Sequence, residues 1–318
     1  MRLLILLLTL ACTAPARADL LYVLNSGDAD IQVLDADTRE EVRRISVLRE
    51  AHHLVWAPDH SVLLIGDSGG NEMLFIQPTT GEVIKRERIS NPYHMEFSPD
   101  GKHLVVTSLR RNQVDIYNWD GADLTLAARL RVSDKPSHLA YRPDSKIVYV
   151  TLQGARSLIA ISLETNQPLW TMEVGRDPAG VIWHRDRLLI GIMGSDNIAV
   201  VDPETRAVER RIVVGRGAHA LFVAPNDGPI YVTSRVDSRI TVLDPGSLAV
   251  LQAWNVPGGP DCLTFDPEGR VWATLRWAGR VAQVDVEAGT MEDTRVGRSP
   301  HGVLFVPRRD VAAAAPAR

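Results

Sequence analysis

Cysteine is almost absent from this sequence of 318 residues, which contains only Cys12 and Cys262. Cys12 lies in an N-terminal segment that we expect to be removed, and a single remaining cysteine cannot form an intramolecular disulfide. Apolar residues make up 45% of the chain. A hydrophobic core, rather than a set of disulfides, must therefore hold the fold together.

Long apolar runs and an excess of basic charge are also missing. No stretch approaches the roughly 20 apolar residues that a transmembrane helix needs, so we expect no membrane span. The formal net charge is −4 and becomes −6 without Arg2 and Arg17, which argues against nucleic acid as a partner. The phosphate loop, the nucleophile elbow, the zinc-protease helix and the CxxCH haem-attachment motif are absent as well.

The first residues have the form of a secretory signal. Met1-Arg2 precedes the apolar run Leu3–Ala11, and Ala16-Arg17-Ala18 is a small-x-small cleavage site. We therefore assign residues 1–18 as a signal peptide and expect a periplasmic or secreted protein. Lipidation of Cys12 is the alternative, although Thr9 is a poor residue three places before such a cysteine. Residues 308–318 are expected to form a disordered tail.

One octapeptide, with the form Pro92-Tyr93-His94-Met95-Glu96-Phe97-Ser98-Pro99, recurs along the whole chain. Its copies are 40 to 44 residues apart and begin at Ala51, Pro92, Pro136, Pro178, Ala218, Pro260 and Pro300. A period this steady indicates a repeat architecture. Between copies, short runs rich in Val, Ile, Leu, Tyr and Trp alternate with turn residues, and no helical period occurs. Each repeat is therefore predicted to be a four-stranded antiparallel meander.

The two ends of the chain complete one blade. Residues 19–50 supply three strands without a leading octapeptide, whereas the octapeptide at Pro300 has no strands after it. Six whole repeats and one split repeat predict an all-β, seven-bladed β-propeller over residues 19–307. The C-terminal strand would close the ring by pairing with the N-terminal strands, so that no sheet edge stays open.

Several strands carry variants of one short motif, namely Tyr22-Val23-Leu24-Asn25, Tyr149-Val150-Thr151 and Tyr231-Val232-Thr233-Ser234. Together with Ser98-Pro99-Asp100-Gly101, they resemble the YVTN-type, YncE-like β-propeller repeats of exported bacterial proteins, over essentially the whole mature chain. The resemblance implies the fold and export, whereas members of this family differ in what they bind. The spread of histidines around the ring also resembles that of two related propellers. One is the propeller that binds the specialised haem of cytochrome-type nitrite reductases and of that haem's maturation proteins, and the other is the copper domain of nitrous oxide reductase.

Histidine at the second or third octapeptide position is the sharpest chemical signal. The candidate metal ligands are His52, His53, His94, His138, His219 and His301, together with Asp261 and Cys262 of the sixth copy. In a meander blade, the start of the innermost strand and the turn after the second strand lie at the same end of the channel. The loops at that end supply the candidate cofactor-binding residues Arg110, Arg111, Arg235, Arg276 and Trp277.

Imidazole suits Zn, Cu, Ni or Fe, including haem iron, and arginine forks suit carboxylates. The combination predicts a transition metal or a haem-like tetrapyrrole cofactor at a histidine-lined channel mouth. Histidines that hydrogen-bond to the backbone of the neighbouring blade are the other interpretation, because a repeat array copies such a device without any ligand. The shift of histidine between two octapeptide positions favours side chains that reach for a shared centre.

The leading hypothesis is a monomeric ligand-binding propeller that serves metal or cofactor handling, maturation or delivery. Its partners would be a small ligand or metal and, beyond these, a periplasmic protein. A metal-assisted lyase or hydrolase, or an oxidoreductase acting on a tetrapyrrole, is one alternative. An interaction scaffold without a ligand is the other.

Cleavage after Ala18 is expected when the full chain is expressed with a functional secretion pathway, because the apolar run and the cleavage site agree. Intact-mass measurement of the exported protein should give a chain that starts at Asp19. A mass that includes diacylglycerol on Cys12 would contradict this and support the lipoprotein.

Overall fold

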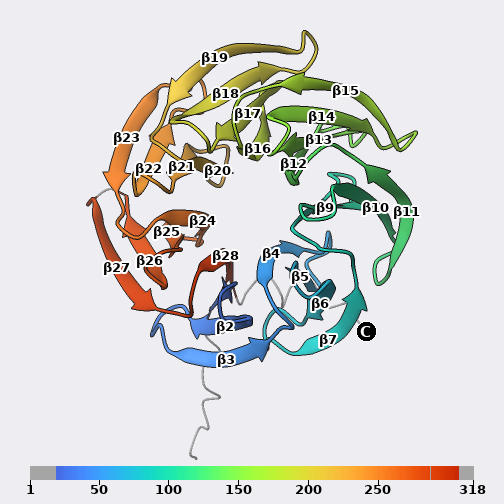
Figure 1. Cartoon of the computed structure of the whole chain (residues 1–318). Helices are drawn as coiled ribbons and strands as arrows, with labels where there is room; N and C mark the ends of the chain where they lie inside the picture. Colours follow the sequence, from blue (N-terminus) through green and yellow to red (C-terminus); the bar gives the residue numbers. More distant parts are fainter. Residues whose placement is uncertain (1–18, 287, 308–318) are drawn as a thin grey trace, which may run out of the picture.

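Seven four-stranded antiparallel sheets surround a central channel like blades in the computed structural model, which describes residues 19–286 and 288–307 (Figure 1). This confirms the predicted all-β, seven-bladed propeller. The signal peptide, Cys12 and the C-terminal tail assigned from the sequence lie outside the described residues. Within the described ranges, no helix is long and apolar enough to cross a membrane.

Each blade has an innermost strand beside the channel, two middle strands and an outermost strand (Figure 1). The innermost strands contain the octapeptide copies and are β4 (Ala51–Trp56), β8 (His94–Phe97), β12 (Pro136–Tyr141), β16 (Pro178–His184), β20 (Ala218–Val223), β24 (Pro260–Phe265) and β28 (Pro300–Val306). The second strands are β1 (Leu20–Asn25), β5 (Leu63–Asp67), β9 (His103–Ser108), β13 (Ile147–Leu152), β17 (Arg187–Ile192), β21 (Ile230–Ser234) and β25 (Val271–Leu275).

The third strands are β2 (Asp30–Asp35), β6 (Glu72–Ile76), β10 (Gln113–Trp119), β14 (Ser157–Ser162), β18 (Asn197–Asp202), β22 (Arg239–Leu243) and β26 (Arg280–Asp285). The outermost strands are β3 (Glu41–Ser46), β7 (Val83–Arg88), β11 (Leu124–Arg131), β15 (Gln167–Glu173), β19 (Ala207–Val213), β23 (Val250–Asn255) and β27 (Thr290–Arg295). The two middle strands of each blade are buried almost throughout, whereas the outermost strands are largely exposed. The core therefore consists of the layers between adjacent blades.

The ring closes where the two ends of the chain meet. β28 pairs antiparallel with β1, and Leu20 lies opposite Val306 and Val23 opposite Val303. One sheet thus combines the last described strand with the first three, in the order β28-β1-β2-β3. This confirms the closure predicted from the two incomplete repeats.

Aromatic residues at the sixth octapeptide position pack one blade against the next. Trp183 stacks on Tyr149 of the preceding blade with ring centroids 5.9 Å apart. The Tyr141 hydroxyl donates to the carbonyl of Glu96 at 2.8 Å and accepts from the amide of Val105 at 3.2 Å. Large rings at this position fill the interblade layer and, in the case of tyrosine, also pair backbone groups of the neighbouring blade.

A β-bulge interrupts most of the innermost strands at the second and third octapeptide positions. The register with the second strand shifts between Pro136 and Leu139 in β12, and between Pro260 and Leu263 in β24. In a regular strand, consecutive side chains point to opposite faces, and a bulge breaks that alternation. In β4, both His52 and His53 consequently approach the same carbonyl.

Deletion of Ser299–Pro307 should abolish a cooperative thermal transition, because it leaves β1 with an unpaired edge and removes one whole strand from a sheet. Circular dichroism melting and size-exclusion chromatography measure this. Deletion of Arg308–Arg318, which lies outside the described residues, serves as the control. A melt of the Ser299–Pro307 deletion that matches the parent protein would contradict the role of β28 in closing the ring.

Candidate functional site

The channel contains a cluster of six imidazole rings, the histidine cluster, made of His52, His53, His94, His138, His219 and His301. The ring centroids of His53 and His94 are 4.4 Å apart, and His138 follows at 4.6 Å from His94. His52 and His301 lie 3.9 Å apart, centroid to centroid. The structure therefore brings together all six histidines that the sequence analysis selected, from five different blades.

The histidine cluster lies inside the channel and not at a solvent-filled mouth, which corrects the sequence-based expectation. Five of the six histidines are between 0 and 7% exposed, and His53 is half-buried. Burial lowers the pKa of every one of these rings below the ordinary 6.5, and lowers that of His53 to about 3. The rings are therefore neutral at pH 7, and a neutral ring is the form of imidazole that binds metal.

Four blades use a threonine on the second strand to join the innermost strand to the next blade. Oγ1 of Thr151 accepts from the amide of His138 at 3.0 Å and donates to the carbonyl of Ala179 in the next blade at 2.8 Å. The same pair of hydrogen bonds links the third octapeptide position of one blade to the second position of the next throughout this set. The four residues are Thr107, Thr151, Thr233 and Thr274.

In the other blades, the residue in place of this threonine is Leu24, Gly66 or Gly191. Two of the carbonyls that consequently lack a threonine are paired by histidine. The carbonyl of His52 accepts from Nδ1 of His301 at 2.9 Å, and that of Tyr93 accepts from Nδ1 of His52 and of His53 at 2.8 and 2.9 Å. Because a carbonyl only accepts, a ring that donates to it carries its proton on Nδ1 and keeps the lone pair on Nε2. His52 and His53 share the carbonyl of Tyr93, and their Nδ1 atoms also lie 2.9 Å from each other. Backbone pairing, the alternative interpretation of the ring, thus describes three of the six histidines.

The remaining rings have nitrogen atoms without a partner. Among the described residues, Nδ1 of His94, Nε2 of His138 and Nε2 of His219 are buried and make no hydrogen bond. An unpaired buried polar atom costs about 1–3 kcal/mol. His53, His94 and His138, here called the three-histidine group, each offer a ligand atom, and these atoms lie within 4.8 Å of one another. The donors fit a transition metal that prefers imidazole, such as Zn, Cu, Ni or Fe.

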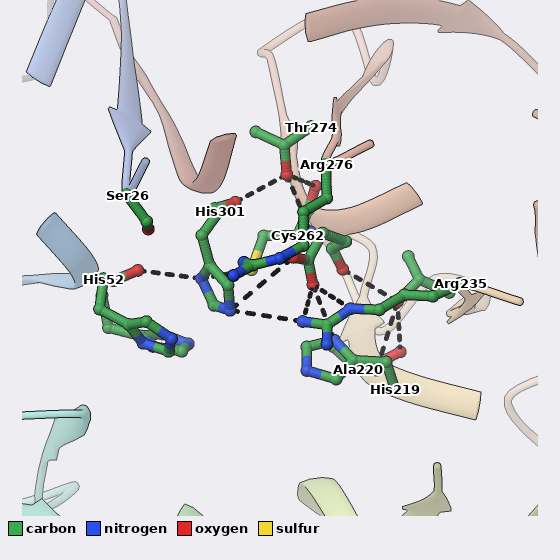
Figure 2. A network of polar contacts seen from close by, with 12 residues as sticks. Ser26, His52, His219, Ala220, Arg235, Cys262, Thr274, Arg276 and His301 are labelled. Carbon is green, nitrogen blue, oxygen red and sulfur yellow. Dashed lines mark hydrogen bonds and ion pairs between the residues drawn. The ribbon is translucent and has the colours of Figure 1, made fainter. Parts of the chain in front are cut away.

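A second group, His219, Asp261 and His301, also has its ligand atoms within 4.8 Å of one another. Its carboxylate already has cationic partners: Arg235 forms an ion pair with Oδ1 of Asp261, and Arg276 lies 3.1 Å from Oδ2. Burial alone would raise the pKa of Asp261, but Arg235, His301 and His219 outweigh it and hold the pKa well below its ordinary value. Figure 2 shows Arg235 directed at His301, whose Nε2 lies 3.5 Å from Nη2 of the arginine.

Of the other residues selected from the sequence, three lie at the surface. Arg110 pairs with Glu50 at 2.6 Å, Arg111 is exposed, and the side chain of Trp277 is 61% exposed. Trp277 and Arg276 border a separate hollow of about 430 Å³. Of the five candidate cofactor-binding residues, the structure thus brings Arg235 and Arg276 to the histidine cluster through Asp261.

Cys262 is buried beside His301, with Sγ 3.7 Å from Nδ1. Burial raises the pKa of its thiol, so the thiolate that binds metals is disfavoured at neutral pH. Cys262 therefore contributes to the wall of the channel as a small apolar side chain.

The channel continues past the histidines as a cavity of about 480 Å³, here called the chamber. It extends toward the end of the channel at which the innermost strands finish, here called the hairpin end. His53, His94 and His138 form part of its wall, and Glu96 lies in the next layer, with Oε1 3.7 Å from Nε2 of His94. The apolar surroundings raise the pKa of the Glu96 carboxyl to about 8, while 43% of the side chain remains accessible.

Glu96 was not selected from the sequence, although a signal was present. Beyond the bulge the strand alternates regularly, so the fifth octapeptide position faces the same way as the third. At the fifth position the seven copies have Val55, Glu96, Ala140, Ile182, Phe222, Thr264 and Leu304. One carboxylate among these mostly apolar residues marks a channel-facing functional candidate.

Comparison with family models matches residues 5–309 to the YNCE-like β-propeller. A comparison with curated proteins found no significant match. Among solved structures, the dihydro-heme d1 dehydrogenase NirN in complex with DHE is similar at 15% identity and a TM-score of 0.67, covering 97% of this chain and 79% of that one.

A functionally unknown protein from Desulfotomaculum acetoxidans DSM 771 is similar at 9% identity and a TM-score of 0.78, over 91% of this chain and 99% of that one. The hydrazine synthase of Kuenenia stuttgartiensis is similar at 18% identity and a TM-score of 0.68, over 81% and 90%. At these identities the likeness to solved structures concerns the fold.

Replacement of Asp261 by asparagine should lower the free energy of unfolding by about 3 kcal/mol, because it leaves Arg235 and Arg276 without their counter-charge inside the channel. Asp237→Asn is the matched control, since Asp237 pairs with Arg216 at the surface and should cost less than about 1 kcal/mol. Urea denaturation at pH 7 measures both. Equal losses in the two variants would show that the Asp261 pairs do not stabilise the channel.

Proposed function

The chain belongs to the YNCE-like β-propeller family, and from that premise we propose that it binds one divalent transition metal through His53, His94 and His138. The observation that carries this proposal is the pair of buried, unpartnered nitrogens on His94 and His138, beside His53, which offers a third ligand atom in the same group. Bound there, the metal would supply a Lewis acid at the head of the chamber.

Charge favours the three-histidine group over the group that contains Asp261. Two arginines and one carboxylate leave the second group with an excess positive charge, before any imidazole is counted. Two like charges about 4 Å apart repel by about 4 kcal/mol at an effective dielectric constant of 20. Among the described residues, no lysine or arginine forms a hydrogen bond or ion pair with the three-histidine group, and the acid Glu96 lies 3.7 Å from His94.

The N-terminal segment supports a second part of the proposal, namely that the protein is exported and meets its metal outside the cytoplasm. Handling or delivery of the metal is the role we assign, because the ligands are enclosed by the ring. We propose further that it works as a monomer with a small ligand or metal and that a periplasmic protein receives the cargo.

A haem-like tetrapyrrole is the second candidate ligand. It is favoured by the similarity to a dihydro-heme d1 dehydrogenase in complex with DHE. In that case a histidine of the cluster would hold the iron, and arginines near the channel would pair with the carboxylates of the macrocycle. Titration with haemin, followed by the Soret band, tests this candidate beside the metal.

The variant His94→Ala/His138→Ala should bind Zn²⁺ more than about 100-fold more weakly than the parent protein, since even loss of an outer-shell partner of a metal ligand costs about 10–100-fold. Isothermal titration calorimetry on the folded, metal-free protein measures the affinity and should give one metal per chain. Elemental analysis of protein purified from a metal-replete periplasm identifies the natural metal.

Two control variants sharpen the result. His60→Ala/His103→Ala removes two histidines that lie outside the channel lining and should leave binding unchanged. His219→Ala should also leave it unchanged if the three-histidine group is the site, and should abolish it if the Asp261 group is. Full binding by His94→Ala/His138→Ala, or no metal in the parent protein, would overturn the proposal.

A further inference from the structure

The third octapeptide position divides the channel wall into two unlike halves. Three consecutive blades place histidine there, and these are His53, His94 and His138. The other four blades place small residues there, and these are Gly180, Ala220, Cys262 and Gly302. All seven residues line the chamber. On the chamber side, the three histidines therefore face small residues across the channel. On their other side, His301 and His219 lie against His53 and His138, with ring centroids 4.7 and 5.3 Å apart.

Close packing of the blades keeps the chamber side open. A Cβ atom at Gly180 would lie 2.7 Å from the carbonyl oxygen of His219, and one at Gly302 would lie 2.9 Å from Cδ2 of Leu54. Both glycines are thus required where neighbouring innermost strands approach each other. A metal held by the three-histidine group consequently has an unfilled side, and that side faces the chamber.

The lining of the chamber limits what can occupy it. Its described walls contain Leu, Val, Ile, Phe and Met side chains, with Glu96 as the one carboxylate and no lysine or arginine. Apart from the proposed metal, an anion would find no cation in these walls, and apolar walls penalise any ion. The volume of about 480 Å³ is in the range of small-molecule sites. Solvent reaches the chamber from the hairpin end, because the histidines and the Asp261 ion pairs fill the opposite end.

We infer that the chamber is the binding site for a small neutral molecule that approaches from the hairpin end. This molecule would donate a lone pair to the open side of the metal and an N–H or O–H group to Glu96. The inference rests on the proposed metal site. A compact neutral heteroaromatic ring with one lone-pair nitrogen and one N–H has this chemistry.

The probes are Co²⁺ as the metal, pyrazole as the neutral ligand and azide as the anion. Pyrazole should shift the visible absorption of the Co²⁺-loaded protein saturably, with an affinity at least about tenfold higher than that of azide. Ala220→Leu fills the small-residue side of the chamber and should weaken pyrazole at least about tenfold while retaining Co²⁺. Val223→Leu is the matched control, because Val223 is on the same strand but exposed and outside the chamber lining.

The outcomes separate the two proposals. If the parent protein binds no Co²⁺, both the metal site and this inference fail. If it binds Co²⁺ and pyrazole produces no shift, or azide binds as well as pyrazole, the inference fails and the metal site stands. Equal pyrazole binding by Ala220→Leu and the parent also overturns it. Should Ala220→Leu not fold, Leu304→Trp narrows the chamber from β28 and must produce the same loss of pyrazole with retention of Co²⁺.

Discussion

The backbone carbonyl at the second octapeptide position is the group on which the channel depends. Seven innermost strands converge at a narrow axis, and each brings a carbonyl that is buried and needs a donor. Four strands receive that donor from a threonine of the preceding blade. Two others receive it from Nδ1 of a histidine. A ring that donates to a carbonyl through Nδ1 keeps its lone pair on Nε2, so a requirement of the fold would also prepare such a side chain for the proposed metal.

Asp261 is the second buried polar group on which the channel depends, and it lies at the other side of the histidine cluster. Its carboxylate is fully buried, yet it is ionised because two arginines reach it, Arg235 from a loop of the preceding blade and Arg276 from a loop of its own blade. Those loops would otherwise bring uncompensated positive charge to the channel axis. The ion pairs close this end of the channel, and they separate an arginine-rich surface from neutral imidazoles a few ångströms below. Electrostatics therefore distinguishes the three-histidine group from His219 and His301, which lie beside the two arginines.

The sequence predicted the architecture nearly completely, because the octapeptide period, the turn residues and the two incomplete ends all follow from local patterns. It also selected the six histidines that meet. It could not predict their burial or the open end, because these depend on how far neighbouring strands approach and on the bulge that turns both His52 and His53 to one side. The sequence also could not predict the partner of Arg235, because Asp261 lies 26 residues away on another blade. Glu96 could have been selected from the sequence, because regular alternation beyond the bulge places it on the same face as His94.

The seam between β28 and β1 has a consequence for biosynthesis. His301 reaches the carbonyl of His52 across 249 residues of chain, so this contact can form only after nearly the whole protein has been made. Until then, β1 lacks the strand at its inner edge, and the carbonyl of His52 lacks its partner His301. The histidine cluster therefore becomes complete only when the last strand of the chain is in place.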